Sequence, residues 1–272
     1  MLGQRTLIPS SGGARIPLDV YIPEVTDEID GDIRRPAVVI CPGGGYQLLS
    51  RREAEPVAVR FAAAGFNIFV LWYRFAPHRY PLPQQDAAAA VAHVRAHADE
   101  YNTDPNRIAI LGFSAGGHLA GSLGTLWQRE ELWREMGLAP AQVRPNAMVL
   151  CYPVISGGEY AHRGSFENLT GTRDTARHAE YSVDGWVSEN TPPAFIWHTY
   201  EDKSVPVQNS LLMAQALARH GILTELHVFP YGAHGSSLCD GQTSGTRNPQ
   251  YVLPDNAVWV EMAQRFLRKA MG

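Results

Sequence analysis

Short apolar runs alternate with stretches of helical periodicity along most of this 272-residue chain. Apolar runs of roughly four to eight residues, bounded by turn residues, are typical of buried strands, and longer periodic stretches are typical of helices. Their alternation predicts an α/β fold, in which strand–helix units surround a mostly parallel sheet. We expect strands at residues 18–22, 37–41, 67–73, 107–111, 147–152, 194–200 and 224–229.

The stretches between these strands carry helix patterns and helix stop signals. Gly65 and Gly221 each follow such a stretch, as glycine commonly does at the end of a helix. No linker, repeat or low-complexity tract interrupts the alternation, so we expect residues 1–272 to form a single domain. The expected helices span residues 57–64, 84–101, 115–127, 207–220 and 257–271.

Two connections, residues 153–193 and 230–254, are unusually long. Long loops inside a compact domain are usually functional, so we expect both to contribute to the activity. The sequence leaves open whether the first of them holds short helices.

The composition is that of an ordinary globular protein, with 45% hydrophobic and 18% charged residues. The net charge is −4 and no Lys/Arg-rich run occurs, so neither nucleic acid nor a membrane surface is expected as a partner. No apolar stretch approaches the roughly 18 residues of a membrane span. The first residues lack the apolar segment of a signal peptide, so we expect a cytoplasmic protein, and an oligomer is compatible with the sequence.

The three cysteines, Cys41, Cys151 and Cys239, are too few for a disulfide framework, and their number is odd. Cys41 and Cys151 belong to apolar runs, so we expect buried, reduced side chains. No spacing of cysteine and histidine resembles a zinc site, and we expect no metal.

The sequence GFSAG (residues 112–116) stands between an expected strand and an expected helix. This is the context of the nucleophile elbow, a sharp turn that exposes a serine at the end of a strand. The residues two places before and after that serine must be small, and both are glycine here. A chance match is the alternative because the bare pattern is common, but the flanking strand and helix favour Ser114 as a nucleophile.

A serine nucleophile needs a base, and the base needs a carboxylate that orients it. Asp202 follows an expected strand and is the candidate acid, with its neighbour Glu201 as the alternative. His234 lies beyond the last expected strand, in a loop flanked by glycines, and is the candidate base. The rival histidines are His118, on the helix after Ser114, and His198, which we expect to be buried and hydrogen-bonded within a strand.

The negative charge that develops during acyl transfer needs hydrogen-bond donors held in place. We expect one of them to be the N–H of Ala115, at the start of a helix. Consecutive glycines after the expected strand 37–41 suit the others, and Gly44 and Gly45 are the candidates. A dinucleotide-binding GxGxxG pattern fails because residue 48 is leucine, and no phosphate-loop lysine follows, so no cofactor is expected.

With these residues in place, the chain resembles α/β-hydrolase carboxylesterases of the acetyl xylan and feruloyl-esterase-like group, which are related to the hormone-sensitive-lipase-like esterases. Nearly the whole chain takes part, and GFSAGGH and HTYEDKSVP are the most specific segments. The matching stretches are CPGGGY (41–46), YRFAP (73–77), YPLPQQDAAAAV (80–91), DPNRIAILGFSAGGHLA (104–120), TPPAFIWHTYEDKSVPVQNS (191–210) and YGAHG (231–235).

The resemblance implies an α/β-hydrolase fold without a large cap domain. One departure is Pro42, which replaces the histidine that often braces the glycine loop in this group. The implied catalytic triad is Ser114, Asp202 and His234, and the implied oxyanion hole is formed by Gly44, Gly45 and Ala115.

The resemblance favours hydrolysis of short-chain acyl esters, above all acetyl esters of xylo-oligosaccharides or related sugars. A serine peptidase or amidase on the same fold is one alternative. A binding protein that has kept the fold without catalysis is another, although such proteins typically lose a triad residue.

Several further side chains have candidate roles. Tyr46 follows the glycines and is a candidate for the border of the acyl pocket, or a packing aromatic. Phe166, Tyr181 and Trp186 lie in the first long connection and are candidates for a wall that faces a sugar, with ordinary packing as the alternative. Arg74 and Asp86 are expected to form a structural hydrogen bond or ion pair.

Overall fold

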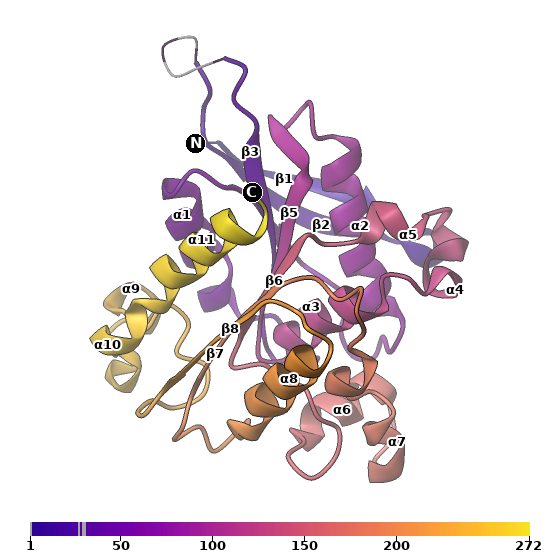
Figure 1. Cartoon of the computed structure of the whole chain (residues 1–272), viewed down its shortest axis with the longest axis vertical. Coiled ribbons are helices and arrows are strands. Elements are labelled where there is room, and N and C mark those ends of the chain that lie inside the picture. Colours follow the sequence, from indigo (N-terminus) through magenta and orange to yellow (C-terminus); the bar gives the residue numbers. More distant parts are fainter. Residues whose placement is uncertain (1, 27, 29–30) are drawn as a thin grey trace.

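The computed structural model describes residues 2–26, 28 and 31–272, and its described strands form one eight-stranded sheet (Figure 1). The strand order across the sheet is β1-β2-β4-β3-β5-β6-β7-β8. The strands are β1 (Leu2–Pro9), β2 (Arg15–Ile22), β3 (Arg35–Cys41), β4 (Asn67–Leu71), β5 (Thr103–Phe113), β6 (Ala147–Cys151), β7 (Ala194–Thr199) and β8 (Thr224–Phe229).

The sheet is mostly parallel, as the alternation of apolar runs predicts. The six strands from β4 through β3, β5, β6 and β7 to β8 pair in parallel with one another. β2 pairs antiparallel with β4, and β1 pairs antiparallel with β2. β1 is not among the expected strands. Among the described side chains of β1, only that of Ile8 is buried. Polar residues interrupt its sequence, LGQRTLIP, so it lacks a continuous apolar run of the kind that predicts a buried strand.

Helices cover both faces of the sheet and create two apolar cores. On one face lie α2 (Leu82–Ala96), α3 (Ala115–Leu126) and α8 (Gln208–Arg219). On the other face lie α1 (Glu55–Ala63) and α11 (Trp259–Ala270). All five expected helices are therefore present, although α2 ends five residues before the expected boundary.

Short helices fill the long connections. The connection between β6 and β7 holds α6 (Arg163–Thr170), α7 (Thr175–Ala179) and the 3-10 turn η4 (Val183–Trp186). The connection after β8 holds α9 (Gly241–Ser244), the 3-10 turn η5 (Pro249–Tyr251) and α10 (Pro254–Ala257). Between α3 and β6 lie α4 (Glu130–Trp133), η3 (Arg134–Met136) and α5 (Pro140–Val143). The other 3-10 turns are η1 (Ser11–Gly13) and η2 (Arg51–Glu53).

Smaller expectations are also met. The three cysteines are buried and free. Arg74 and Asp86 form a buried ion pair, with 2.7 Å between the guanidinium and the carboxylate. Among the described helices, none is long and apolar enough to cross a membrane.

The start of β1 and Gly272, which lies just beyond α11, are near the edge of the sheet where the parallel strands begin (Figure 1). Gly3 pairs with Tyr21, which in turn pairs with Ile68 near the start of β4. The carbonyl oxygen of Gly272 accepts a hydrogen bond from Arg107. The next residue of β5, Ile108, pairs with Ala37 near the start of β3. The opposite edge, where the parallel strands end, is therefore free for loops that carry chemistry.

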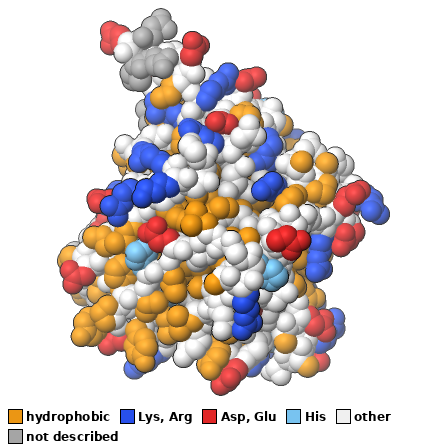
Figure 2. Space-filling view, in the orientation of Figure 1, with side chains coloured by type: hydrophobic (Ala, Val, Ile, Leu, Met, Phe, Trp, Pro, Cys, Tyr) orange, Lys and Arg blue, Asp and Glu red, His pale blue; other side chains and the backbone are white. Residues whose placement is uncertain are grey.

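β8 lies at one side of the sheet and has a described strand partner on one flank only. Exposed hydrophobic side chains surround it, among them Val228, Tyr200 and Tyr231. Figure 2 shows hydrophobic side chains gathered at the lower left of the molecule, where β7 and β8 run in Figure 1. This side of the sheet is therefore more apolar than the rest of the face in view.

Candidate active site

Ser114 occupies a strained turn between β5 and α3. Its φ is 53°, in the left-handed region that a residue with a side chain rarely adopts. The turn is held by a hydrogen bond from the Ser114 N–H to the carbonyl oxygen of Cys151 at the end of β6. Ser114 is 7% exposed, so the turn presents the side chain at the edge of the sheet with little contact to solvent.

The glycines on either side of Ser114 are required by close backbone contacts. A Cβ at Gly112 would lie 2.0 Å from the carbonyl oxygen of Gly116, and a Cβ at Gly116 would lie 2.1 Å from that of Cys41. Neither distance is compatible with a side chain. The GFSAG pattern therefore follows from how closely β3, β5 and α3 approach one another.

We expect Gly112→Ala to lower both the melting temperature and kcat, because the new methyl group must push the elbow apart. A displacement of about 1 Å at a reacting group costs on the order of 10²-fold in rate. Gly241→Ala is the matched control, since a Cβ at that position meets nothing within 4 Å. Thermal unfolding and ester hydrolysis of both variants test this, and a Gly112→Ala variant indistinguishable from Gly241→Ala would contradict it.

The structure brings Ser114, His234 and Asp202 into one hydrogen-bonded row. The Ser114 Oγ lies 2.8 Å from His234 Nε2, and His234 Nδ1 lies 2.6 Å from Asp202 Oδ2. An ionised carboxylate only accepts hydrogen bonds, so Nδ1 carries the imidazole proton and Nε2 accepts from the serine hydroxyl. Asp202 is fully buried and the side chain of His234 is 20% exposed. The row can therefore remove a proton from the serine during attack.

Each oxygen of Asp202 has more than one contact. Oδ1 accepts hydrogen bonds from the N–H groups of Ser204 and Val205, both 2.9 Å away. Oδ2 faces His234 and also lies 3.3 Å from His198 Nε2. Burial alone would raise the pKa of Asp202, but the hydrogen bonds from His198 and His234 outweigh it and hold the pKa well below its usual range. The carboxylate is therefore ionised at neutral pH.

The rival residues lie outside the row. The exposed side chain of Glu201 approaches only the N–H of Gly232, at 3.4 Å. His198 is buried and contacts Ser210 and the carbonyl oxygen of Val205, as expected for a hydrogen-bonded histidine in a strand. His118 is buried below Ser114, and burial lowers its pKa to about 4. Of the alternatives weighed from the sequence, His234 is the histidine that contacts Ser114, and Asp202 is the carboxylate that contacts His234.

The glycine loop after β3 approaches this row at Gly43, where an added Cβ would lie 3.1 Å from the Cβ of Ser114. Gly44 and Gly45 have φ values of 131° and 66°, and their N–H groups make no hydrogen bond with any residue that the structure describes. Ala115 is the first residue of α3, where N–H groups have no partner within the helix. These three amides are the candidate oxyanion hole.

The loop is braced without the histidine that Pro42 replaces. The Tyr73 hydroxyl donates to the carbonyl oxygen of Pro42, and Asn168 on α6 donates to that of Gly45. The N–H of Gly43 donates to the buried carboxylate of Glu53. None of these three braces is predicted by the sequence analysis, because each depends on a contact between residues distant in the chain.

The candidate substrate residues differ in exposure. Tyr46 is 1% exposed and its hydroxyl lies 2.9 Å from His118 Nδ1, so its side chain packs in the core, as in the alternative interpretation. Phe166 is also buried, edge-on to the same histidine. Trp186 is partly exposed and packs edge-on against His118 and Tyr181. Of the aromatic candidates, Trp186 and Tyr181 retain surface that a substrate can contact.

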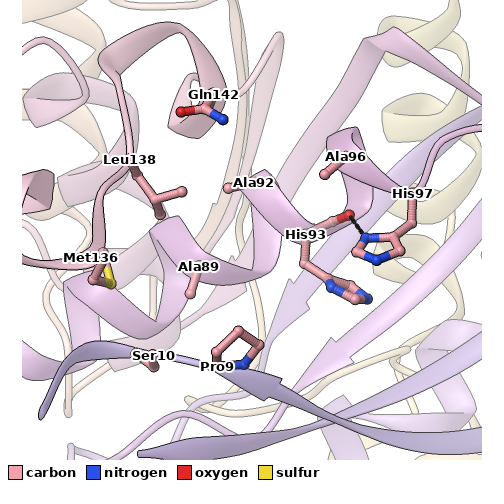
Figure 3. A pocket seen from close by; sticks show the side chains of 10 residues that line it. All are labelled: Pro9, Ser10, Ala89, Ala92, His93, Ala96, His97, Met136, Leu138 and Gln142. Carbon is pink, nitrogen blue, oxygen red and sulfur yellow. Dashed lines mark hydrogen bonds between the residues drawn. The ribbon is translucent and has the colours of Figure 1, made fainter. Parts of the chain in front are cut away.

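A hollow elsewhere on the molecule is separate from this row. Figure 3 shows it beside α2, with Ala89 and His93 from that helix, His97 directly after its end, and Leu138 opposite them. None of its lining residues belongs to the triad or to the glycine loop. The candidate site is therefore formed by the loops at the edge of the sheet where the parallel strands end, and this hollow is not part of it.

Comparison with known proteins gives consistent matches. The BD-FAE family model matches residues 18–217. The chain is 38% identical to endo-1,4-beta-xylanase B of Butyrivibrio fibrisolvens over 82% of its own length, and 34% identical to the acetylxylan esterase of Xylanibacter ruminicola over 73%. It covers only 36% and 40% of these two relatives.

Solved structures match over nearly the whole of both chains. An acetyl ester-xyloside bifunctional hydrolase from Caldicellulosiruptor lactoaceticus is 35% identical, with a TM-score of 0.81 and coverage of 99% of this chain and 97% of the other. The carboxylesterase Cest-2923 from Lactobacillus plantarum WCFS1 is 29% identical, with a TM-score of 0.88 and coverage of 99% and 98%. The expected fold is confirmed, and the chain belongs to the BD-FAE family of α/β-hydrolase esterases.

Proposed function

We propose that this protein is a serine carboxylesterase that hydrolyses short-chain acyl esters, above all acetyl esters of xylo-oligosaccharides or related sugars. The observation that carries the proposal is the row from Ser114 through His234 to Asp202, with contacts of 2.8 and 2.6 Å. The next two amides of the loop that approaches Ser114 at Gly43, those of Gly44 and Gly45, have no acceptor among the described residues, and free amides of this kind are suited to a developing oxyanion.

The reaction proceeds through an acyl-enzyme. His234 Nε2 takes the proton from Ser114 as the serine oxygen attacks the ester carbonyl carbon, and Asp202 stabilises the imidazolium that forms. The oxyanion accepts hydrogen bonds from Gly44, Gly45 and Ala115. The imidazolium then returns its proton to the departing alcohol. A water molecule repeats the cycle on the acyl-enzyme and releases the carboxylic acid.

The sugar and acetyl parts of the proposal are supported by the relatives. One relative is named an acetylxylan esterase, and one similar solved structure is that of an acetyl ester-xyloside bifunctional hydrolase. The aromatic side chains of Tyr181 and Trp186, in the connection that follows β6, offer a surface of the kind on which sugar rings stack. Under this proposal Trp186 contacts the alcohol part of the substrate.

The proposal is tested by a hydrolysis panel. We expect kcat/KM to fall from acetyl to butyryl and longer acyl esters, and acetylated xylo-oligosaccharides to be cleaved faster than feruloylated ones. A fluorophosphonate probe should label Ser114 in the wild-type protein. Equal rates for all acyl lengths would remove the preference for acetyl groups.

Two results of the same panel would point to the other functions. Faster cleavage of amides than of esters would favour a peptidase or amidase. Absence of both hydrolysis and labelling would favour a binding protein that has kept the fold.

A further inference from the structure

Glu53 is a buried carboxyl group next to the candidate site that the triad does not use. It is 3% exposed and ends the 3-10 turn η2. Buried carboxylates are rare unless they are paired or hydrogen-bonded, so its contacts indicate why it is there.

One oxygen of Glu53 holds the glycine loop. Oε2 accepts a hydrogen bond of 2.8 Å from the N–H of Gly43, directly before the two candidate oxyanion amides. A Cβ at Gly43 would lie 2.8 Å from this oxygen and 3.1 Å from the Cβ of Ser114. Glu53 therefore supports the glycine loop from behind, and only the backbone of Gly43 separates it from the nucleophile.

The other oxygen of Glu53 connects to the loop that carries His234. Oε1 accepts a hydrogen bond of 2.7 Å from the hydroxyl of Tyr152, which itself accepts one of 3.0 Å from the N–H of Ser237. The ring of Tyr152 packs edge-on against the His234 imidazole, with 5.1 Å between ring centres. The same carboxyl group thus contacts the glycine loop directly and is connected to the loop that carries His234 through Tyr152.

The turn around Glu53 adds two more links to the histidine loop. The guanidinium of Arg52 donates to the carbonyl oxygen of Gly235, and the carbonyl oxygen of Arg52 accepts from the Ser237 hydroxyl. Tyr152 and Ser237 have φ values of 35° and 53°, in the sparsely populated left-handed region. Backbone in this region persists only where its surroundings hold it.

The hydrogen-bond pattern fits an ionised carboxylate. The N–H of Gly43 donates a hydrogen bond to Oε2 of Glu53. The hydroxyl oxygen of Tyr152 accepts a hydrogen bond from the N–H of Ser237, and the hydroxyl proton of Tyr152 is donated to Oε1 of Glu53. Burial raises the pKa of Glu53, while Tyr152, Gly43 and the nearby His234 and Arg52 oppose the rise. A second negative charge near His234 also favours the imidazolium that forms during the reaction.

We propose that Glu53 is a positioning residue: its carboxylate fixes the oxyanion loop through Gly43 and aligns it, through Tyr152 and Ser237, with the loop that carries His234. This inference rests on the proposed esterase function. Glu53 itself touches neither substrate nor the reacting atoms. It acts by keeping the amides of Gly44 and Gly45 and the imidazole of His234 at a fixed separation.

Glu53→Gln and Tyr152→Phe test the inference. The glutamine side chain of Glu53→Gln has nearly the same shape as glutamate. Its N–H₂ group cannot accept a hydrogen bond, so it faces either the Gly43 N–H or the Tyr152 hydroxyl without accepting from it. We expect kcat to fall about 10²-fold with KM nearly unchanged, as when an oxyanion donor is lost. Tyr152→Phe removes both hydrogen bonds of the hydroxyl, the one to Glu53 and the one from Ser237, and should lower kcat roughly tenfold. The double variant should lose no more than Glu53→Gln alone, because both changes break the same chain of contacts.

The matched control is Asp86→Asn, which removes a fully buried carboxylate that is hydrogen-bonded by Ser10 and Arg74, in neither of the two loops. It should lower the melting temperature while kcat stays close to wild type. A trifluoromethyl ketone, which adds to the serine and places an oxyanion in the hole, gives a further measurement. Its inhibition constant should rise in Glu53→Gln in proportion to the fall in kcat/KM.

Hydrogen exchange provides a measurement that does not need activity. The hydrogen-bonded amides of Gly43, Gln47 and Leu48 should exchange faster in Glu53→Gln than in Asp86→Asn. Wild-type kcat, inhibition and exchange in a folded Glu53→Gln variant would overturn the inference and leave the esterase function intact. A wild-type protein without hydrolysis or labelling would overturn the esterase function, and the exchange experiment would then decide whether Glu53 holds the loop. If Glu53→Gln does not fold, Tyr152→Phe carries the same test.

Discussion

Replacing Ser114 by alanine is expected to lower kcat for an acetyl ester by about 10⁴-fold or more while the fold is kept. The hydroxyl is the group that His234 contacts at 2.8 Å, and without it no acyl-enzyme can form. Labelling by a fluorophosphonate should disappear with the activity. Initial rates on an aryl acetate, together with the melting temperature, provide the measurement.

Ser122→Ala is the control for this substitution. Ser122 is also buried and lies on α3, two turns beyond the nucleophile, where its hydroxyl donates to the carbonyl oxygen of His118. Its loss should leave labelling at Ser114 intact. Near wild-type hydrolysis by Ser114→Ala would remove Ser114 as the nucleophile and, with it, the proposed mechanism.

Asp202→Asn is expected to reduce kcat by about 10⁴-fold through the tautomer of His234. Asparagine can direct its N–H₂ group at Nδ1, which must then accept, so the imidazole proton moves to Nε2. In that tautomer Nε2 no longer accepts the proton of Ser114. The binding of substrate should change little, so the loss is expected in kcat rather than in KM.

Glu201→Gln separates Asp202 from its neighbour. Because the side chain of Glu201 is exposed and approaches only the N–H of Gly232, this variant should retain nearly full activity. If Glu201→Gln were the inactive variant and Asp202→Asn the active one, the acid of the triad would be Glu201.

Asp202→Asn is also expected to change how the stability of the fold depends on acidity. The pKa of Asp202 lies below its ordinary value in the folded protein, so its ionised form stabilises the fold at pH values above about 4, and this stabilisation is lost as pH falls further. Asp202→Asn lacks this contribution. Urea unfolding should therefore show a difference between wild type and variant that shrinks on acidification, and a constant difference would contradict the depressed pKa.

The arrangement of Ser114, Asp202 and His234 could be predicted because each follows an apolar run. Such runs form the parallel strands β5, β7 and β8, whose ends meet at one edge of the sheet. Apolar periodicity identifies strands of this kind, and chain order then fixes which residues are brought together. The GFSAG turn adds a local signal that requires no knowledge of distant residues.

Other features depend on contacts that no local pattern reveals. Glu53 lies in the charged run RREAE (residues 51–55), which is typical of an exposed turn, whereas its buried carboxylate is hydrogen-bonded by Gly43 and Tyr152. β1 has almost no buried side chains and exists because it pairs with β2. The helices α6 and α7 are only eight and five residues long, too short for periodicity to establish.

The positions of the two chain ends have a practical consequence. Gly3 and Gly272 lie near the edge where the parallel strands begin, while the row of Ser114, His234 and Asp202 lies at the edge where they end. A resin, electrode or carrier protein attached through either terminus would hold the molecule by the far side of the sheet. Immobilisation at these points would leave the proposed substrate, an acetylated oligosaccharide, free to approach from the other side.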